Sequence, residues 1–166
     1  MSQVPASVFV VMGVAGSGKS TVGAALAAAL GIAFVDGDDL HPLANKQKMA
    51  QGIPLDDNDR APWLAAIGEV LARGSVVVAC SALKRRYRDQ LRAAQPLLRL
   101  IELTGSRDLL ASRLAGRQHE YMPASLLDSQ LSALEPPDPD EEAVVMDIAA
   151  PSDQIVADIL EIIHHG

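Results

Sequence analysis

A glycine-rich segment directly behind an apolar run is the feature that most limits how this chain can fold. The run Val8–Met12 (VFVVM) leads into Gly13–Ser20 (GVAGSGKS), which fits the pattern GxxxxGK[ST]. Thr21–Leu30 then has the composition of a helix, so the pattern predicts a strand, a tight turn and a helix. Glycines let bare backbone approach a ligand closely, and the N–H groups of such a loop converge on anionic oxygens. The segment therefore predicts a nucleotide-phosphate site; the alternative is a glycine-rich turn that binds nothing.

This P-loop pattern also assigns roles to single residues. Lys19 is expected to reach the β- and γ-phosphates of the nucleotide and to be catalytic, and the Ser20 hydroxyl is expected to ligate Mg²⁺. The expected nucleotide contacts of the segment are Gly13, Val14, Ala15, Gly16, Ser17, Gly18, Lys19, Ser20 and Thr21.

Composition limits the class of protein. A chain of 166 residues, 49% of them hydrophobic, is long enough for one domain with a real core. The formal net charge of −7 argues against non-specific nucleic-acid binding, which needs an electropositive surface. The single cysteine, Cys80, excludes an intramolecular disulfide and suits a reducing compartment. There is no basic segment before an apolar one at the start, and no apolar run of the roughly 20 residues that span a membrane. We expect a soluble, cytoplasmic protein without nucleic-acid or membrane partners.

Strand-like runs alternate with stretches of helical periodicity along the rest of the chain, which predicts the α/β class with a parallel sheet covered by helices. Further strands are expected at Ala33–Val35, Val76–Ala79, Leu98–Leu103 and Ala143–Asp147. Helices are expected at residues 45–50, 61–73, 84–94, 106–116, 124–134 and 151–163, with Asp59 near the start of the second. Without internal repeats or a linker, residues 1–166 are expected to form one domain.

Carboxylates gather where the second strand ends. Asp36, Asp38 and Asp39 follow it directly, with His41 just behind. Carboxylates this close repel one another unless a cation or a hydroxyl donor lies among them. One of them is expected to hold water on Mg²⁺ and another to take a proton from an acceptor hydroxyl. The alternative is a polar turn with a helix-capping aspartate.

Basic residues gather on the helix expected after the third strand. Lys84 and Arg88 are spaced i,i+4, so on a helix they share one face and are expected to bind a carboxylate or phosphate. Arg85 and Arg86 point elsewhere and are expected to be solvated. The alternative is a basic surface paired with acids such as Asp89.

Arg113 and Arg117 are also spaced i,i+4, in and beside the irregular stretch after the fourth strand. They are expected to close over the nucleotide and neutralise charge during phosphoryl transfer; the alternative is a helix surface. Trp63 and Cys80 are expected in the core. The adjacent pair His164 and His165 diverges on a helix, so it predicts no metal site.

Three blocks resemble the small P-loop gluconokinases. They are Asp36–Leu64 (DGDDLHPLANKQKMAQGIPLDDNDRAPWL), Cys80–Arg92 (CSALKRRYRDQLR) and Ser129–Glu135 (SQLSALE). With the P-loop, the similarity spans nearly the whole chain. The resemblance implies ATP:D-gluconate 6-phosphotransferase activity and, often, a homodimer. It also implies a fold like those of shikimate and nucleoside monophosphate kinases, with strand order 2-3-1-4-5, an acceptor-binding insertion at about 37–62 and a lid at about 113–142.

The resemblance further implies roles for individual residues. Asp36 would hold Mg²⁺ through water, and Asp38 would contact the acceptor hydroxyl. Arg117 would be the lid arginine. The sugar-acid pocket would be lined by His41, Lys48, Arg60, Lys84 and Arg88. The family often has GHF after the lid arginine, whereas this chain reads RQHEYMP from Arg117, with Glu120 at the histidine position and His119 one residue early. No role is carried over to that histidine.

Two other functions compete with this interpretation. A related kinase for shikimate or another sugar acid would share the P-loop, but it would not account for the block at 36–64. A nucleotide-dependent switch ATPase would need no acceptor pocket, and it leaves the convergent Asp, His, Lys and Arg residues unexplained.

Overall fold

Five parallel strands form a single sheet in the computed structural model of the protein, which describes residues 7–115 and 124–165. The strands are β1 (Val8–Met12), β2 (Ala33–Asp36), β3 (Val76–Ala79), β4 (Arg99–Thr104) and β5 (Val144–Asp147). Their order across the sheet is β2-β3-β1-β4-β5, and every neighbouring pair is parallel. The α/β class and the expected strand order are confirmed. The expected lid arginine Arg117 lies outside the described residues, as do His119 and Glu120.

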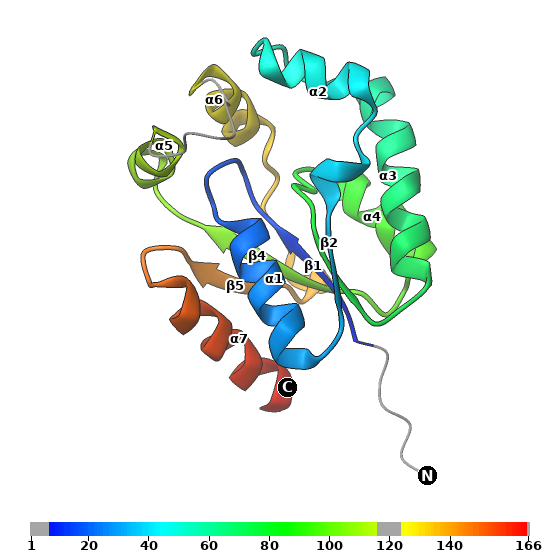
Figure 1. Cartoon of the computed structure of the whole chain (residues 1–166), viewed down its shortest axis with the longest axis vertical. Helices are drawn as coiled ribbons and strands as arrows, with labels where there is room; N and C mark the ends of the chain where they lie inside the picture. Colours follow the sequence, from blue (N-terminus) through cyan, green and yellow to red (C-terminus); the bar gives the residue numbers. More distant parts are fainter. Residues whose placement is uncertain (1–6, 116–123, 166) are drawn as a thin grey trace.

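Helices cover both faces of this sheet (Figure 1). They are α1 (Lys19–Leu30), α2 (Leu43–Ala50), α3 (Asp57–Ala72), α4 (Arg85–Ala94), α5 (Arg107–Ala115), α6 (Ala124–Ala133) and α7 (Ser152–His165). Two short 3₁₀ turns, η1 (Gly37–Leu40) and η2 (Pro139–Glu141), complete the described elements. No helix in the described part of the chain is both long and apolar enough to cross a bilayer.

The two central strands explain why the sheet is sandwiched between helices. Every residue of β1 and β3 is buried, as expected of parallel strands that are covered on both faces. Phe9 and Val11 of β1 pack with α1 and α7 on one face, in a cluster that includes Leu26 and Ile159. Their neighbours Val8 and Val10 pack on the other face, where α3 and α4 cover the sheet. Alternate side chains of one strand thus serve two cores.

Helix α3 begins four residues earlier than expected. Asp56 caps it: the Asp59 N–H donates to Asp56 Oδ1 (2.8 Å), and the Asp56 N–H donates to Asp59 Oδ2 (3.0 Å). This reciprocal capping box satisfies two N–H groups that a helix start otherwise leaves free. Asp59 is therefore inside the first turn rather than before the helix. The early start turns residues 57–60 toward the carboxyl edge of the sheet, where ligands of such folds bind.

Candidate active site

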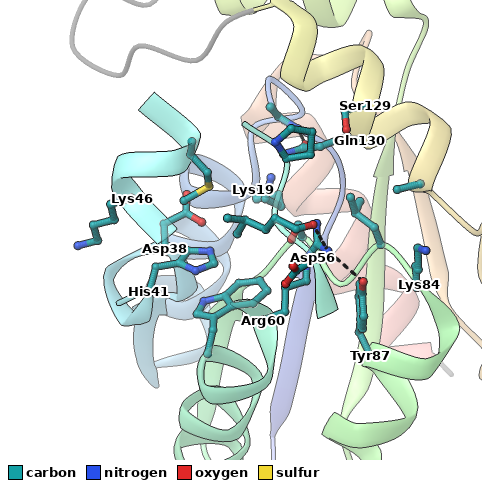
Figure 2. Close-up of a pocket in the computed structure, with 18 of the residues that line it drawn as sticks. Lys19, Asp38, His41, Lys46, Asp56, Arg60, Lys84, Tyr87, Ser129 and Gln130 are labelled. Carbon is teal, nitrogen blue, oxygen red and sulfur yellow. Dashed lines mark hydrogen bonds between the residues drawn. The ribbon is translucent and has the colours of Figure 1, made fainter. Parts of the chain in front are cut away.

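One cavity of about 940 Å³ lies at that carboxyl edge. The P-loop, η1, α2 and the first turns of α3 and α4 line it, and Ser129 and Gln130 of α6 lie at its upper edge in Figure 2. Segments far apart in the sequence therefore place their polar side chains around one space. Its polar lining includes Lys19, Asp38, His41, Arg60 and Lys84.

The P-loop has the backbone of a phosphate cradle. Gly16 (φ 85°) and Gly18 (φ 89°) both adopt left-handed conformations that favour glycine. The Lys19 ammonium folds back along the loop and donates to the Val14 carbonyl (3.2 Å) while it lines the cavity. The Ser17 hydroxyl is buried and has no hydrogen-bond partner among the described residues. The positive-φ glycine backbone and the Lys19 ammonium at the cavity fit a polyanionic ligand, whereas the Ser17 hydroxyl lies outside the cavity lining.

The P-loop residues divide by position. Those that line the cavity are Ala15, Gly16, Gly18, Lys19 and Ser20. Gly13, Val14, Ser17 and Thr21 lie outside its lining, so their expected nucleotide contacts stay predictions.

Helix α6 contacts the P-loop directly. The Ala15 N–H donates to Gln130 Oε1 (2.7 Å), across 115 positions of sequence. Gln130 and its neighbour Ser129 also line the cavity. The sequence analysis missed Gln130 as a site residue, although it lies in the third block of resemblance. That membership was the available signal.

Ser20 and Asp36 come together as the P-loop pattern and the resemblance predict. The Ser20 hydroxyl donates to Asp36 Oδ2 (2.7 Å), and Asp36 Oδ1 accepts from the Asp38 N–H (3.0 Å). A hydroxyl and a carboxylate are oxygen donors of the kind that Mg²⁺ prefers. Within residues 7–115 and 124–165, no three His, Cys, Asp or Glu side chains are grouped to hold a metal. The donor set therefore fits a cation that is shared with substrate phosphates, as Mg²⁺ usually is.

His41 is held tightly in the wall of the cavity. Its ring stacks on the Trp63 indole (centroids 4.1 Å apart, planes inclined by 12°), and its Nδ1 contacts Asn45 Nδ2 (3.1 Å). Burial, together with the nearby charges of Arg60 and Lys46, lowers the pKa of His41 to about 4. The imidazole is therefore neutral at physiological pH.

Trp63 serves both the core and this wall. The expectation that it is buried is confirmed, at 1% exposure, and its ring also lines the cavity. The indole N–H donates to the Gly37 carbonyl (2.7 Å), which ties η1 to α3. Neither this contact nor the role of Asn45 has a local sequence signal, because each joins residues from separate elements.

Arg60 and Tyr87 form the opposite wall. Arg60 Nη1 donates to the Leu55 carbonyl (2.7 Å) and to the Tyr87 hydroxyl (3.0 Å), which donates in turn to Asp57 Oδ1 (2.6 Å). The Arg60 guanidinium carbon lies 5.2 Å from the centre of the Tyr87 ring. The two hydrogen bonds from Nη1 and the contact with the Tyr87 ring thus orient Arg60 before any ligand binds. Arg86 is exposed, as expected, and it also pairs with Asp57 (2.6 Å) and lines the same cavity.

Two residues expected in the pocket lie elsewhere. Lys48 Nζ donates to both oxygens of Asp59 (3.0 and 2.9 Å) and is not part of the cavity lining; its neighbours Lys46 and Met49 are. The strong carboxylate partner on α3 draws Lys48 away from the opening.

Arg88 is buried away from the cavity in which it was expected. It is 1% exposed, and its guanidinium donates to Glu141 Oε1 (2.8 Å), Glu141 Oε2 (3.1 Å) and the Ala82 carbonyl (2.9 Å). The side chain of Glu141 is completely buried. Because the guanidinium is committed to buried partners and does not line the cavity, the prediction that Arg88 binds the acceptor is wrong.

The outer side of α4 anchors the acidic segment after α6. Arg85 donates to Asp138 (2.9 Å) and to Asp140 (2.7 Å), and its own N–H donates to Glu135 Oε1 (2.9 Å). The expectation that Arg85 is solvated is therefore only half right, since its side chain is part-exposed but paired. Arg113 donates to the Ile148 carbonyl and does not line the cavity. Its nucleotide contact stays a prediction, as does the role of Arg117, which lies outside the described residues.

Comparison with known proteins places this site in a family. A family model described as an AAA domain matches residues 8–137. The thermoresistant gluconokinase of Escherichia coli is 43% identical over 96% of this chain and 94% of its own length. A gluconokinase from Sinorhizobium meliloti of known crystal structure is 52% identical, with a TM-score of 0.86 over 93% of this chain and 90% of its own.

A more distant likeness concerns the fold alone. The crystal structure of a shikimate kinase from Bacteroides thetaiotaomicron superposes with a TM-score of 0.71 at 18% identity, over 95% of this chain and 98% of its own. This likeness shows a shared fold, whereas the gluconokinases named above also share 43% and 52% of their residues with this chain. The chain belongs to the gluconokinase family.

Proposed function

We propose that this protein transfers the γ-phosphoryl group of ATP to the 6-hydroxyl of D-gluconate, giving 6-phosphogluconate. The observation that carries the proposal is a single cavity in which the P-loop lysine faces carboxylate, imidazole, guanidinium and ammonium groups. A switch ATPase would have no use for such a set. Membership in the gluconokinase family supports the choice of gluconate as acceptor.

The phosphate half of the reaction belongs to the P-loop. Its backbone N–H groups and Lys19 would hold the triphosphate and neutralise charge as it develops on the transferring group. Ser20 and Asp36 would hold Mg²⁺, Asp36 through water. When bound, Mg²⁺ would draw charge from the β- and γ-phosphate oxygens.

The acceptor half would be built on η1, α3 and α4. Asp38 would accept the proton of the 6-hydroxyl. The oxygen of that hydroxyl would bond to the γ-phosphorus while the bond between the γ-phosphorus and the β–γ bridging oxygen breaks. Arg60 and Lys84 would grip the carboxylate of gluconate at the far end of the cavity. The contacts of Arg60 with Leu55 and Tyr87 support this, because they leave less side-chain entropy to lose on binding.

Closure of the site would involve the segment beyond α5. Arg117 would supply charge to the transferring phosphoryl from a lid over residues 113–142, and Arg113 would contact the nucleotide. Exclusion of water by such a lid would favour transfer to the sugar alcohol over hydrolysis. A homodimer is expected from the resemblance, and a cytoplasmic location from the single cysteine and the composition.

A coupled assay of ADP release tests the proposal. The acceptors are D-gluconate, its epimers, other sugar acids and shikimate, each with ATP and Mg²⁺, with Lys19→Ala as the inactive control. We expect gluconate to give the highest kcat/KM and no comparable release without acceptor. Equal ADP release with and without every acceptor would favour the switch ATPase, and a preference for shikimate or another acid would replace gluconate as substrate.

A further inference from the structure

The protonation pattern of His41 can be worked out from its neighbours, beginning with Asn45. The Asn45 amide is 3% exposed, and its Nδ2 lies 2.8 Å from the Asp59 carbonyl. A backbone carbonyl oxygen can only accept a hydrogen bond, so the amide nitrogen, not the oxygen, must face Asp59. The orientation of the Asn45 amide is therefore fixed by chemistry.

The same amide nitrogen faces His41 Nδ1 at 3.1 Å. An amide nitrogen carries two hydrogens and accepts none, so its second hydrogen points at the imidazole and Nδ1 must be the acceptor. A nitrogen that accepts a hydrogen bond carries no proton. In the neutral ring, the one remaining proton then sits on Nε2.

Several groups oppose a second proton on this ring. The ring is 7% exposed and stacked on Trp63, and a proton on Nδ1 would meet the hydrogens of Asn45. Lys46 of α2 and Arg60 of α3 add like charge, and the carboxylate of Asp38 on η1 lines the same cavity. Burial and the two cations outweigh the carboxylate of Asp38 and lower the pKa of His41 to about 4.

Nε2 lies on the opposite side of the ring from the Asn45 contact, and no side chain in the described ranges hydrogen-bonds it. Among the described residues, a fully buried side-chain polar atom without a partner occurs only at Ser17, so Nε2 is accessible. The ring lines the cavity beside Asp38 (Figure 2). The free N–H therefore faces the space where the acceptor is proposed to bind.

We propose that His41 is a fixed hydrogen-bond donor to an oxygen of the acceptor, held in its Nε2–H form by Asn45, and that it is not the general base. The inference rests on the proposed function for the identity of the acceptor. It gives the cavity complementary partners for a polyol: Asp38 can only accept from a hydroxyl, and His41 can only donate to one.

Nitrogen NMR of the protein tests the inference without turnover. Long-range ¹H–¹⁵N correlation spectra distinguish a protonated from an unprotonated ring nitrogen, and the His41→Gln variant identifies which of the four histidines gives the signal. We expect His41 to show a bare Nδ1 and a protonated Nε2 at pH 7, with no titration above pH 5. A proton on Nδ1, or an imidazolium at pH 7, would overturn the inference.

Two matched variants give a second readout. The amide nitrogen of a glutamine can replace Nε2–H, whereas that of an asparagine reaches only the Nδ1 position. We expect His41→Asn to raise the gluconate KM roughly tenfold and His41→Gln to raise it less, with the KM for ATP unchanged in both. Equal losses in kcat of a hundredfold or more in both variants would mark His41 as the base. Should the unaltered protein fail to phosphorylate gluconate, the proposed function falls, while the NMR result still decides the state of His41.

Discussion

Replacing Arg88 by methionine tests whether this arginine serves stability or the acceptor. Methionine keeps much of the side-chain length but removes the charge and every donor. The variant leaves Glu141 fully buried with Arg92, itself 24% exposed, as its remaining cation, and leaves the Ala82 carbonyl without its donor. Breaking a buried ion pair by removing one partner typically costs ~3–5 kcal/mol. The remaining bond from Arg92 (2.7 Å) places this case near the lower end, at about 3 kcal/mol.

The measurement is thermal and urea unfolding, alongside the KM for gluconate. For a domain of this size, about 3 kcal/mol corresponds to a fall in Tm of roughly 6–12 °C. Arg85→Met is the matched control, because its ion pairs are part-exposed and ion pairs at a surface contribute little to stability. The double variant Arg88→Met with Glu141→Leu should recover most of the loss, since it leaves no uncompensated charge. A gluconate KM that rises strongly at unchanged stability would refute this reasoning and return Arg88 to the acceptor site.

Three further perturbations follow from the structure. Burial would raise the pKa of Glu141, but hydrogen bonds from Arg88, the Asp138 N–H and Arg92 outweigh it and lower that pKa to about 2. The stabilisation by Glu141 is thus complete above its unfolded pKa near 4.5 and is lost as the pH falls toward 2. Between pH 5 and pH 2, the free energy of urea unfolding should fall more steeply in the unaltered protein than in the double variant Arg88→Met with Glu141→Leu. Parallel curves would contradict this. Lys19→Ala should keep its circular dichroism spectrum and Tm but lose kcat by roughly a hundred- to a thousandfold, and near-normal turnover would remove Lys19 from the mechanism. Asp38→Asn should lower kcat for gluconate by a hundredfold or more with little change in the ATP KM, whereas a change confined to KM would leave the general base elsewhere.

The parts of the site that the sequence predicts are those in which chemistry and local structure lie in one stretch. The P-loop joins a buried strand to a helix within a few residues, so the positions of its glycines, Lys19 and Ser20 follow from the sequence alone. Asp36 follows because the carboxyl ends of parallel strands meet at one edge, and the structure brings it to 2.7 Å from Ser20.

The wrong predictions have a common physical origin. The i,i+4 argument for Lys84 and Arg88 requires both residues to be helical, but Lys84 caps α4 with extended backbone (φ −111°, ψ 146°) and Arg88 lies inside the helix. The two side chains therefore point in different directions. The true partner of Arg88 is Glu141, 53 positions away, and no periodicity in the sequence marks so distant a pairing. Lys48 was likewise drawn to Asp59, a residue whose position depends on the capping box that begins α3 early.

The stretch between β2 and β3 is joined by bonds among its own residues as well as by bonds to α4. Trp63 bonds to Gly37, Asn45 bonds to Asp59, and Lys48 pairs with Asp59, so η1, α2 and the start of α3 hold one another in place. The P-loop, in contrast, lies between β1 and α1 and is contacted by Gln130 of α6, all outside this stretch. Descent with modification could therefore replace most of the acceptor half as one contiguous segment, with only its contacts to α4 to be refitted, while the phosphate-handling half and the sheet remain as inherited. Enzyme engineers have the same freedom: grafting this segment together with its α4 partners should transfer acceptor preference more cleanly than scattered point changes.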